Sequence, residues 1–298
     1  MNTQQNESRV TVTTFLLAVT ILQFVAGSVG AAPMKAGDIL VADSEAAVIR
    51  VDPKTGRHAI FAAGGSLVRP FGIATDANGN IYVSDTGALA IVQIDPKSAK
   101  QTVIPWGSGH GAPYGIAVDS QGDLIVANAA VLTRVNPLTG EQNIISNSLF
   151  KAPIGVAIDA NGTIFVADAG DGSVIQVDSP TSGHVVCTGL SNPCGIAVEA
   201  GGTLLVTEMD AQRITRIDVQ AQTVDVQINN GTLVTPVGLA VAANGTILVG
   251  DPDVSHLPDD LAGGLFRIDP VTGDQTLLYN GSGNLVNPRG VAVMPAYR

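Results

Sequence analysis

The chain has 298 residues, of which 45% are apolar and 14% charged, and this composition excludes an intrinsically disordered protein. With Gly 34 and Pro 16, turn-forming residues are too frequent for a bundle of long helices. The formal net charge is -11 and no basic run is present, so nucleic acid and anionic membrane surfaces are not expected partners, and we expect a soluble monomer.

The N-terminal segment has the organisation of an export signal. Arg9 lies in a short polar start, an apolar stretch follows from Phe15 to Gly27, and small residues surround Ala31. We therefore expect residues 1–31 to be a signal peptide and the mature protein to be secreted or periplasmic. An uncleaved membrane anchor over residues 15–32 is the alternative, because that stretch is just long enough to cross a bilayer.

After this segment a unit recurs that starts with Pro-x-Gly and continues with alternating small and β-branched residues. Successive units are 40 to 52 residues apart, which is the spacing of propeller blades with four strands each. The units begin at Pro70, Pro113, Pro153, Pro193, Pro236 and Pro288.

Each unit divides into four short strands, which we name a to d. Strand a follows Pro-x-Gly, a turn such as Ala-Asn-Gly closes a hairpin, and an apolar strand b comes next, as at residues 80–85. Strand c has the pattern Arg/Gln-x-Asp, as at residues 49–52, and a turn such as Asp-Pro-Lys-Thr-Gly leads into strand d. Four antiparallel strands then make one blade.

The two ends of the repeat region complement each other. Residues 38–63 supply strands b, c and d without a strand a, whereas residues 290–294 supply a lone strand a. Pairing the two fragments closes the ring and leaves no open edge between the first and last blades. The sequence therefore predicts that residues 32–298 form an all-β, six-bladed β-propeller.

The quoted unit, with Pro-x-Gly-Ile-Ala-Val-Asp followed by x-Gly-x-Ile-x-Val-Ala-Asp, resembles the NHL repeat over residues 37–294. Related propellers include SMP-30/gluconolactonase-like lactonases, virginiamycin B lyase (streptogramin lyase) and many NHL domains that only bind partners. The resemblance implies the fold, whereas the activity has to be inferred from residues that the blades do not share.

The residue between Pro and Gly opens the innermost strand of every blade, so these six residues are expected to surround one mouth of the central channel. The resemblance to SMP-30-type lactonases would require Asn or Asp here to bind a divalent cation, and none of the six is an amide or a carboxylate. Arg289 is the only charged member, which suits a small apolar ligand with a carboxylate or carbonyl group; the alternative is that it pairs with a nearby carboxylate and fills the channel. The six residues are Phe71, Tyr114, Ile154, Cys194, Val237 and Arg289.

An acidic or amide residue ends strand b in each blade, and Asp168 is one of them. Because Asp recurs at this position, we expect it to accept backbone N–H groups of the following turn, with a metal site as the alternative. Asp168 is also counted among the candidate ligand-binding residues at the channel mouth. Glu208 departs from the pattern and resembles the residue that ends this strand in virginiamycin B lyase repeats. That lyase also uses a His base and Mg²⁺, and no matching His lies near Glu208 in the sequence.

Two histidines lie outside the repeat pattern on the expected top face. His110 is in a connection between blades, and His256 is in an insertion at residues 251–264 that also carries four aspartates. This insertion could be a lid, a weak Ca²⁺ or Mg²⁺ site or a tolerated surface loop. The four aspartates are Asp251, Asp253, Asp259 and Asp260.

Cys187 and Cys194 flank one connection between strands d and a. An even number of cysteines in an exported protein favours a disulfide, but strands d and a lie at opposite edges of a blade. A disulfide and a pair of buried thiols therefore both stay open.

These observations favour an exported binding or scaffold propeller that takes a protein or a small ligand at its top face. The alternative is an enzyme related to streptogramin lyase or to the lactonases. Its catalytic groups would come from a pool on the top face: Glu208, Asp168, His110, His256, Arg289 and Tyr114. No cofactor is assigned, and a bound divalent cation would distinguish the enzyme from the binding module.

Overall fold

The computed structural model describes residues 33–107, 109–146, 149–228, 231–254, 263–279 and 286–296. Residues 33–298 form one compact unit, which is described here by itself. The proposed signal peptide lies outside the described residues and stays a prediction. Among the residues described, no helix has the length and apolar character needed to span a bilayer.

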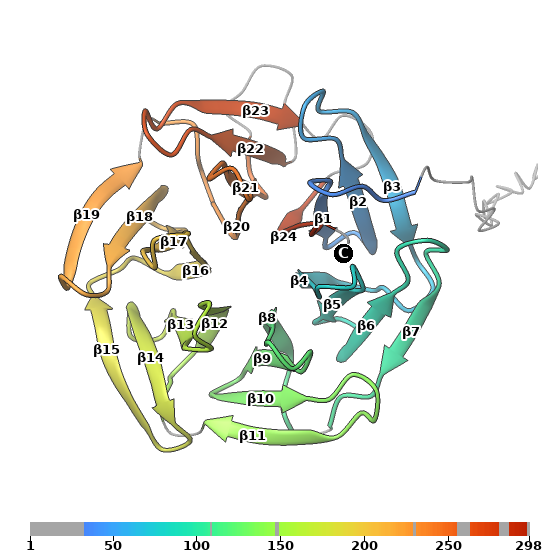
Figure 1. Cartoon of the computed structure of the whole chain (residues 1–298), viewed down its shortest axis with the longest axis horizontal. Helices are drawn as coiled ribbons and strands as arrows, with labels where there is room; N and C mark the ends of the chain where they lie inside the picture. The colour runs from blue at the N-terminus through green and yellow to red at the C-terminus, as the bar shows by residue number, and fades with distance from the viewer. Residues whose placement is uncertain are drawn as a thin grey trace, which may run out of the picture. The chain divides into compact units, whose positions relative to one another are not determined.

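The described chain contains six sheets of four antiparallel strands, arranged in a ring around a central axis (Figure 1). This confirms the predicted six-bladed β-propeller. From the innermost to the outermost strand, the blades are as follows: blade 1, β24 (Pro288–Val293), β1 (Ile39–Asp43), β2 (Ala47–Val51) and β3 (His58–Ala63); blade 2, β4 (Pro70–Thr75), β5 (Ile81–Asp85), β6 (Ala90–Ile94) and β7 (Gln101–Ile104); blade 3, β8 (Pro113–Val118), β9 (Leu124–Asn128), β10 (Val131–Val135) and β11 (Gln142–Ser146); blade 4, β12 (Pro153–Ile158), β13 (Ile164–Asp168), β14 (Ser173–Ser179) and β15 (Ser182–Thr188); blade 5, β16 (Pro193–Val198), β17 (Leu204–Glu208), β18 (Arg213–Asp218) and β19 (Thr223–Ile228); blade 6, β20 (Gly238–Val241), β21 (Ile247–Asp251), β22 (Gly264–Ile268) and β23 (Gln275–Tyr279).

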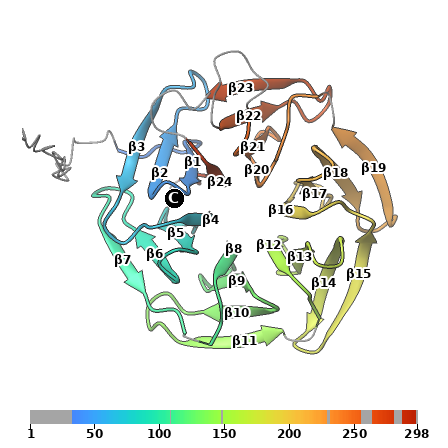
Figure 2. The same ribbon diagram turned by 180° about the vertical axis from the view of Figure 1, so that it is seen from behind.

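The ring closes as predicted, because β24 from the C-terminal end pairs with β1 from the N-terminal end of the propeller. In this antiparallel pair Ile39 lies opposite Val293 and Val41 lies opposite Val291. Figure 2, which shows the ring from behind, places the red β24 beside the blue β1 and β2. The N-terminal and C-terminal parts of the propeller therefore contribute to one blade, in which β1 is paired on both sides.

The core lies between the blades. Buried apolar side chains form six clusters among the described residues, and each cluster joins two neighbouring blades. Strand b is buried along its whole length in most blades, as in β1 and β9, because both of its faces pack against neighbouring sheets. The outermost strands instead expose several of their residues, such as Ile60 and Val185.

The glycine of each Pro-x-Gly unit is required by the close approach of the innermost strands. A Cβ atom added to Gly72 would lie 2.5 Å from the carbonyl oxygen of Tyr114, which is the middle residue of the next unit. The same contact, at 2.5 Å or less, recurs at all six glycines around the ring. A side chain does not fit there, so the repeated glycine fixes how closely the blades converge on the channel.

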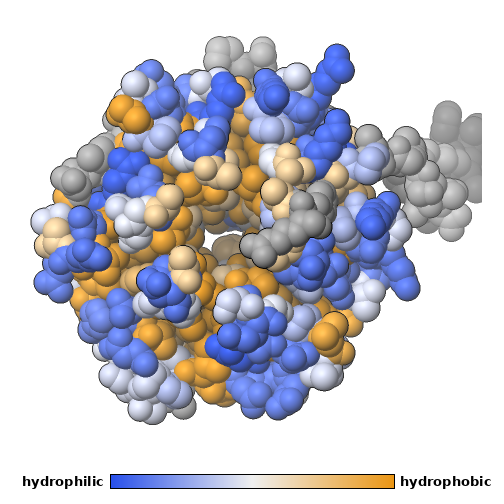
Figure 3. Space-filling model, viewed as in Figure 1, coloured by the Kyte–Doolittle hydropathy of each residue, from blue (hydrophilic) through white to orange (hydrophobic). Residues whose placement is uncertain are grey.

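Strand a begins and strand b ends at the same face of the ring, since Pro70 lies opposite Asp85 and Pro153 lies opposite Asp168. We call this the top face, and the face with the hairpins between strands a and b the bottom face. Figure 3 shows the central opening, with hydrophobic residues around it.

Candidate functional site

The carboxylates that end strand b hold the loops of the top face. Asp85 accepts hydrogen bonds from the backbone N–H groups of Val68 and Arg69 at 2.8 Å, and from those of Gly87 and Ala88 at 3.0 and 2.8 Å. One side chain thus joins the incoming connection to the following turn. Equivalent bonds to both segments are made by Asp43, Asp168 and Asp251.

These four aspartates are buried, so their oxygens serve the backbone rather than solvent. Burial raises the pKa of Asp43 and of Asp251, and the hydrogen bonds from backbone N–H groups oppose this shift. For Asp168 the structure thus places the carboxylate in the turn-holding arrangement that the sequence favoured.

Glu208 is held differently, because its longer side chain reaches a cation. Its carboxylate accepts hydrogen bonds from Arg213 Nε at 2.6 Å and Nη2 at 3.0 Å, from the Thr215 hydroxyl, and from the backbone N–H of Ser191 at 2.7 Å. Burial raises the pKa of Glu208, but the bonds from Arg213, Thr215 and Ser191 outweigh it and hold the pKa below its ordinary value. An ionised, fully buried carboxylate with these partners is poorly placed to exchange protons with a substrate.

His110 lies in the connection between blades 2 and 3. Its ring packs edge-on against Trp106 with centroids 5.3 Å apart, and its carbonyl oxygen accepts a hydrogen bond from Asn128 Nδ2 at 2.7 Å. His110 Nδ1 and Asn128 Oδ1 are buried and have no hydrogen-bond partner within the described part of the chain. His256, the other candidate, lies outside the described residues.

The middle residues of the Pro-x-Gly units lie at the top end of the channel. Phe71, Ile154, Cys194, Val237 and Arg289 line a narrow central cavity of about 70 Å³, together with the glycines that follow them. This space holds a few water molecules and no larger ligand.

A larger cavity, of about 940 Å³, opens beside the channel on the top face of blades 1 to 3. We call it the top-face cavity; it lies in the volume range of small-molecule sites. Phe71 and Arg289 line both spaces, so the two adjoin at the mouth of the channel. The other lining residues include Glu45, Val68, Arg69, Tyr114 and Asn287.

Two guanidinium groups face the top-face cavity. Arg289 is half-buried and Arg69 is exposed, and neither side chain has a hydrogen-bond or ion-pair partner within the ranges that the structure describes. Burial lowers the pKa of Arg289, and the positive charge of Arg69 lowers it further. Asp43, the nearest strand-b carboxylate, is instead used by the backbone N–H groups of Val286 and Asn287. The ion pair considered for Arg289 is therefore not formed with any described residue.

An aromatic corner adjoins the two arginines. The rings of Phe71 and Tyr114 meet edge to face, with centroids 5.3 Å apart and an interplanar angle of 82°. Both side chains are half-buried, and the Tyr114 hydroxyl makes no hydrogen bond with a described residue. The cavity thus combines an apolar wall with donors at its edge.

Arg69 was missed by the sequence analysis. It precedes the Pro-x-Gly unit of blade 2, whereas the residues expected at the channel mouth are those inside the units. Its signal is weak but present, since the other blades have Ala112, Ala152, Asn192, Thr235 or Asn287 there, and blade 2 alone has a cation.

The two cysteines are free, buried thiols. Cys187 packs in the apolar cluster between blades 4 and 5, whereas Cys194 lines the narrow channel. Burial raises the pKa of both, that of Cys194 to about 11. Of the two possibilities left open by the sequence, the structure has the pair of thiols, which are held in their unreactive protonated form.

The insertion between β21 and β22 is described only in part. Asp251 belongs to the buried ring above, Asp253 donates its backbone N–H to Asp251 at 3.1 Å, and Asp259 and Asp260 lie outside the described residues. Within the described ranges, no three His, Cys, Asp or Glu side chains are grouped so that they could hold a metal ion. The predicted Ca²⁺ or Mg²⁺ site in the insertion stays a prediction.

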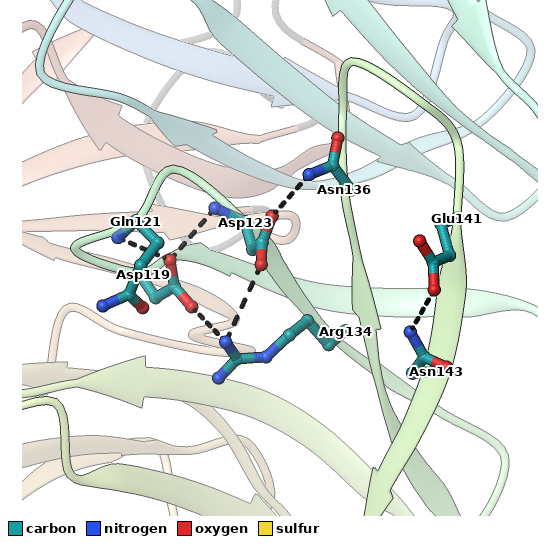
Figure 4. Close-up of polar contacts among 7 residues, drawn as sticks. All are labelled: Asp119, Gln121, Asp123, Arg134, Asn136, Glu141 and Asn143. Carbon is teal, nitrogen blue, oxygen red and sulfur yellow. Dashed lines mark hydrogen bonds and ion pairs between the residues drawn. The ribbon is translucent and has the colours of Figure 1, made fainter.

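On the bottom face, arginines of strand c are paired with carboxylates. Arg134 of blade 3 contacts Asp119 at 3.0 Å and Asp123 at 3.7 Å, and Asn136 donates to Asp123 at 3.2 Å (Figure 4). Equivalent pairs join Arg50 to Asp38 and Arg216 to Glu199. These arginines belong to the scaffold.

Comparison with known proteins gives no family: no protein-family model matches the chain, and no curated protein matches its sequence. Solved structures do match. One, titled as the crystal structure of a nidogen/laminin complex, is 14% identical with a TM-score of 0.76 over 88% of this chain and 99% of that one. Another, a protein of unknown function from Bacteroides caccae, is 14% identical with a TM-score of 0.66 over 87% of this chain and 99% of that one.

The likeness is one of fold. At this identity it supports a six-bladed β-propeller and says nothing of the residues at the mouth.

Proposed function

We propose that the chain is an exported β-propeller of NHL type that works as a binding module through its top face. The observation that carries this proposal is the top-face cavity, where two arginines without described partners adjoin an aromatic corner. Arg289 is half-buried, and charged side chains withdrawn from solvent are ordinarily paired, so its guanidinium without a described partner supports a ligand site at this cavity.

The residues that the blades share support the same conclusion, because they have structural roles. The glycines allow the blades to converge, and the strand-b aspartates hold the connections. Glu208, the most distinctive member of the candidate catalytic pool, is taken by Arg213 and Thr215. A neighbour in fold that comes from a nidogen/laminin complex is consistent with a propeller that binds a partner.

The proposal is tested by capture from the secreted or periplasmic fraction of the source cells on immobilised protein, with quantification of the bound species. Val68→Glu puts a carboxylate into the top-face cavity, and Val271→Glu makes the same change at a bottom-face turn, where the side chain is 91% exposed. We expect at least one species that binds the wild type and Val271→Glu but is lost from Val68→Glu. Equal capture by all three proteins would contradict a top-face site.

A further inference from the structure

We infer that the top-face cavity binds a small organic carboxylate with a flat apolar body, its carboxylate between Arg69 and Arg289 and its body against Phe71 and Tyr114. This inference rests on the proposed function, because it names the ligand of the same face. It is argued from the charged side chains of the cavity, from its aromatic side chains and from the narrow channel beneath it.

The charge of the cavity is opposite to that of the protein. The chain as a whole carries -11, yet the lining of the cavity has two arginines against one carboxylate, that of the exposed Glu45. Arg69 lies close enough to lower the pKa of Arg289, so the two cations repel each other, and the opposing effect of the nearby Asp43 carboxylate is smaller. An anion between them removes this repulsion and supplies acceptors to both guanidinium groups.

The planar fork of arginine favours a carboxylate as that anion. Each guanidinium presents paired N–H donors that match two carboxylate oxygens, and the Tyr114 hydroxyl is a further donor among the side chains that line the cavity.

The remaining wall selects the body of the ligand. Phe71 and Tyr114 stand nearly perpendicular at 82°, so they form an apolar corner in which a flat group stacks on one ring and contacts the edge of the other. Val68, which is 54% exposed, extends this apolar surface away from the channel. A simple inorganic anion would leave this surface uncovered.

The channel sets how deep the ligand reaches. The cavity beneath Phe71 and Arg289 measures about 70 Å³, against about 940 Å³ above it, and backbone contacts between the blades fix its width. The ligand is therefore held at the mouth, where Arg289 is the innermost polar group that it meets.

The test is isothermal titration of the wild-type chain with 2-naphthoate, with 2-naphthamide as the neutral analogue and inorganic phosphate as a simple anion. We expect saturable one-to-one binding of 2-naphthoate, and binding of the amide and of phosphate at least ten-fold weaker. Arg289→Gln and Arg69→Gln should each weaken naphthoate binding about ten-fold or more, because each removes a charged donor. Arg267→Gln is the matched control, since Arg267 is half-buried outside this cavity, and it should bind like the wild type.

Three results would overturn the inference: no binding of 2-naphthoate at millimolar concentration, equal binding of acid and amide, or equal weakening by Arg267→Gln. Any of them leaves the capture experiment unaffected, so a species lost from Val68→Glu would still support a top-face module with another ligand. Conversely, naphthoate binding that depends on Arg69 and Arg289, with equal capture by all variants, would support the anion site and contradict the partner-binding module.

Discussion

The two faces of the propeller use arginine in opposite ways. On the bottom face, Arg134 and Arg216 lie in strand c and each contacts a carboxylate that the repeat places after strand a. On the top face, Arg69 precedes a Pro-x-Gly unit and Arg289 is the variable middle residue of another, and none of the described carboxylates pairs with them. Residue type alone therefore does not identify a binding site. An arginine is a candidate for ligand binding when the repeat does not also supply a carboxylate that pairs with it.

The top face contains one arginine that fits the structural pattern. Arg213 pairs with Glu208 through two hydrogen bonds, and Glu208 is the only strand-b end with this longer acid. At this position the longer side chain of Glu208, in place of Asp, reaches the guanidinium group of Arg213. Arg289 has no such compensation among the described residues, which sharpens the contrast with Arg213.

The largest expected effect concerns the backbone that holds the top mouth in place. In Gly72→Ala the new Cβ would lie 2.5 Å from the Tyr114 carbonyl oxygen and 2.6 Å from Ser84 Oγ. We expect the free energy of unfolding to fall by about 3 kcal/mol, because neighbouring blades must move apart. Urea denaturation followed by circular dichroism measures this change.

The control is Gly201→Ala in a bottom-face hairpin, where nothing lies within 4 Å of the added Cβ. This variant should differ from the wild type by no more than about 0.5 kcal/mol. If both substitutions cost the same, the converging strands are not what fixes the mouth.

The next effect tests the arginines directly. Arg216→Met removes hydrogen bonds of 2.8 and 3.0 Å to Glu199 and leaves that carboxylate without its cation, so we expect a loss of about 2 kcal/mol in the free energy of unfolding. Arg289→Met removes a cation that repels Arg69, and its stability should stay within about 0.5 kcal/mol of the wild type. Thermal and urea denaturation of both variants check the difference.

A comparable loss in both variants would mean that Arg289 stabilises the fold like the bottom-face arginines. The double variant Glu199→Gln/Arg216→Met serves as a control. It should recover part of the loss, since it no longer buries an unpaired carboxylate.

The sequence predicted the fold well because the repeat makes the same local choices six times. Pro-x-Gly starts strand a, Gly79 with a φ of 82° closes a hairpin, and the fragments at the two ends complete one blade. The positions around the mouth follow from the same register. The repeat does not encode how the loops of neighbouring blades contact one another.

The top-face cavity depends on these contacts between loops. Arg69 and Arg289 belong to different blades and are 220 positions apart in the chain, so no local pattern brings them together. Glu208 stood out in the sequence as a departure from Asp, but its role depends on Arg213, which lies opposite it across a turn. Side-chain partners of this kind depend on which residues lie opposite each other in paired strands, and the repeat pattern alone does not give these pairs.

The smallest expected effect is in the pH dependence of stability, and it separates the paired top-face arginine from the unpaired ones. The pKa of Glu208 is lowered from its ordinary value of 4.5 in the folded protein, so its contribution to stability is present above this value. That contribution is lost as the pH falls through the lower folded pKa, because the protonated carboxyl no longer pairs with Arg213.

Glu208→Gln should therefore flatten the acid side of the curve of unfolding free energy against pH. Glu141→Gln is the control, because it changes an exposed carboxylate on the bottom face, and it should leave the curve like that of the wild type. If both variants lose stability in acid as steeply as the wild type, Glu208 and Arg213 are not coupled as the hydrogen bonds indicate, and the contrast between paired and unpaired arginines on the top face would fail.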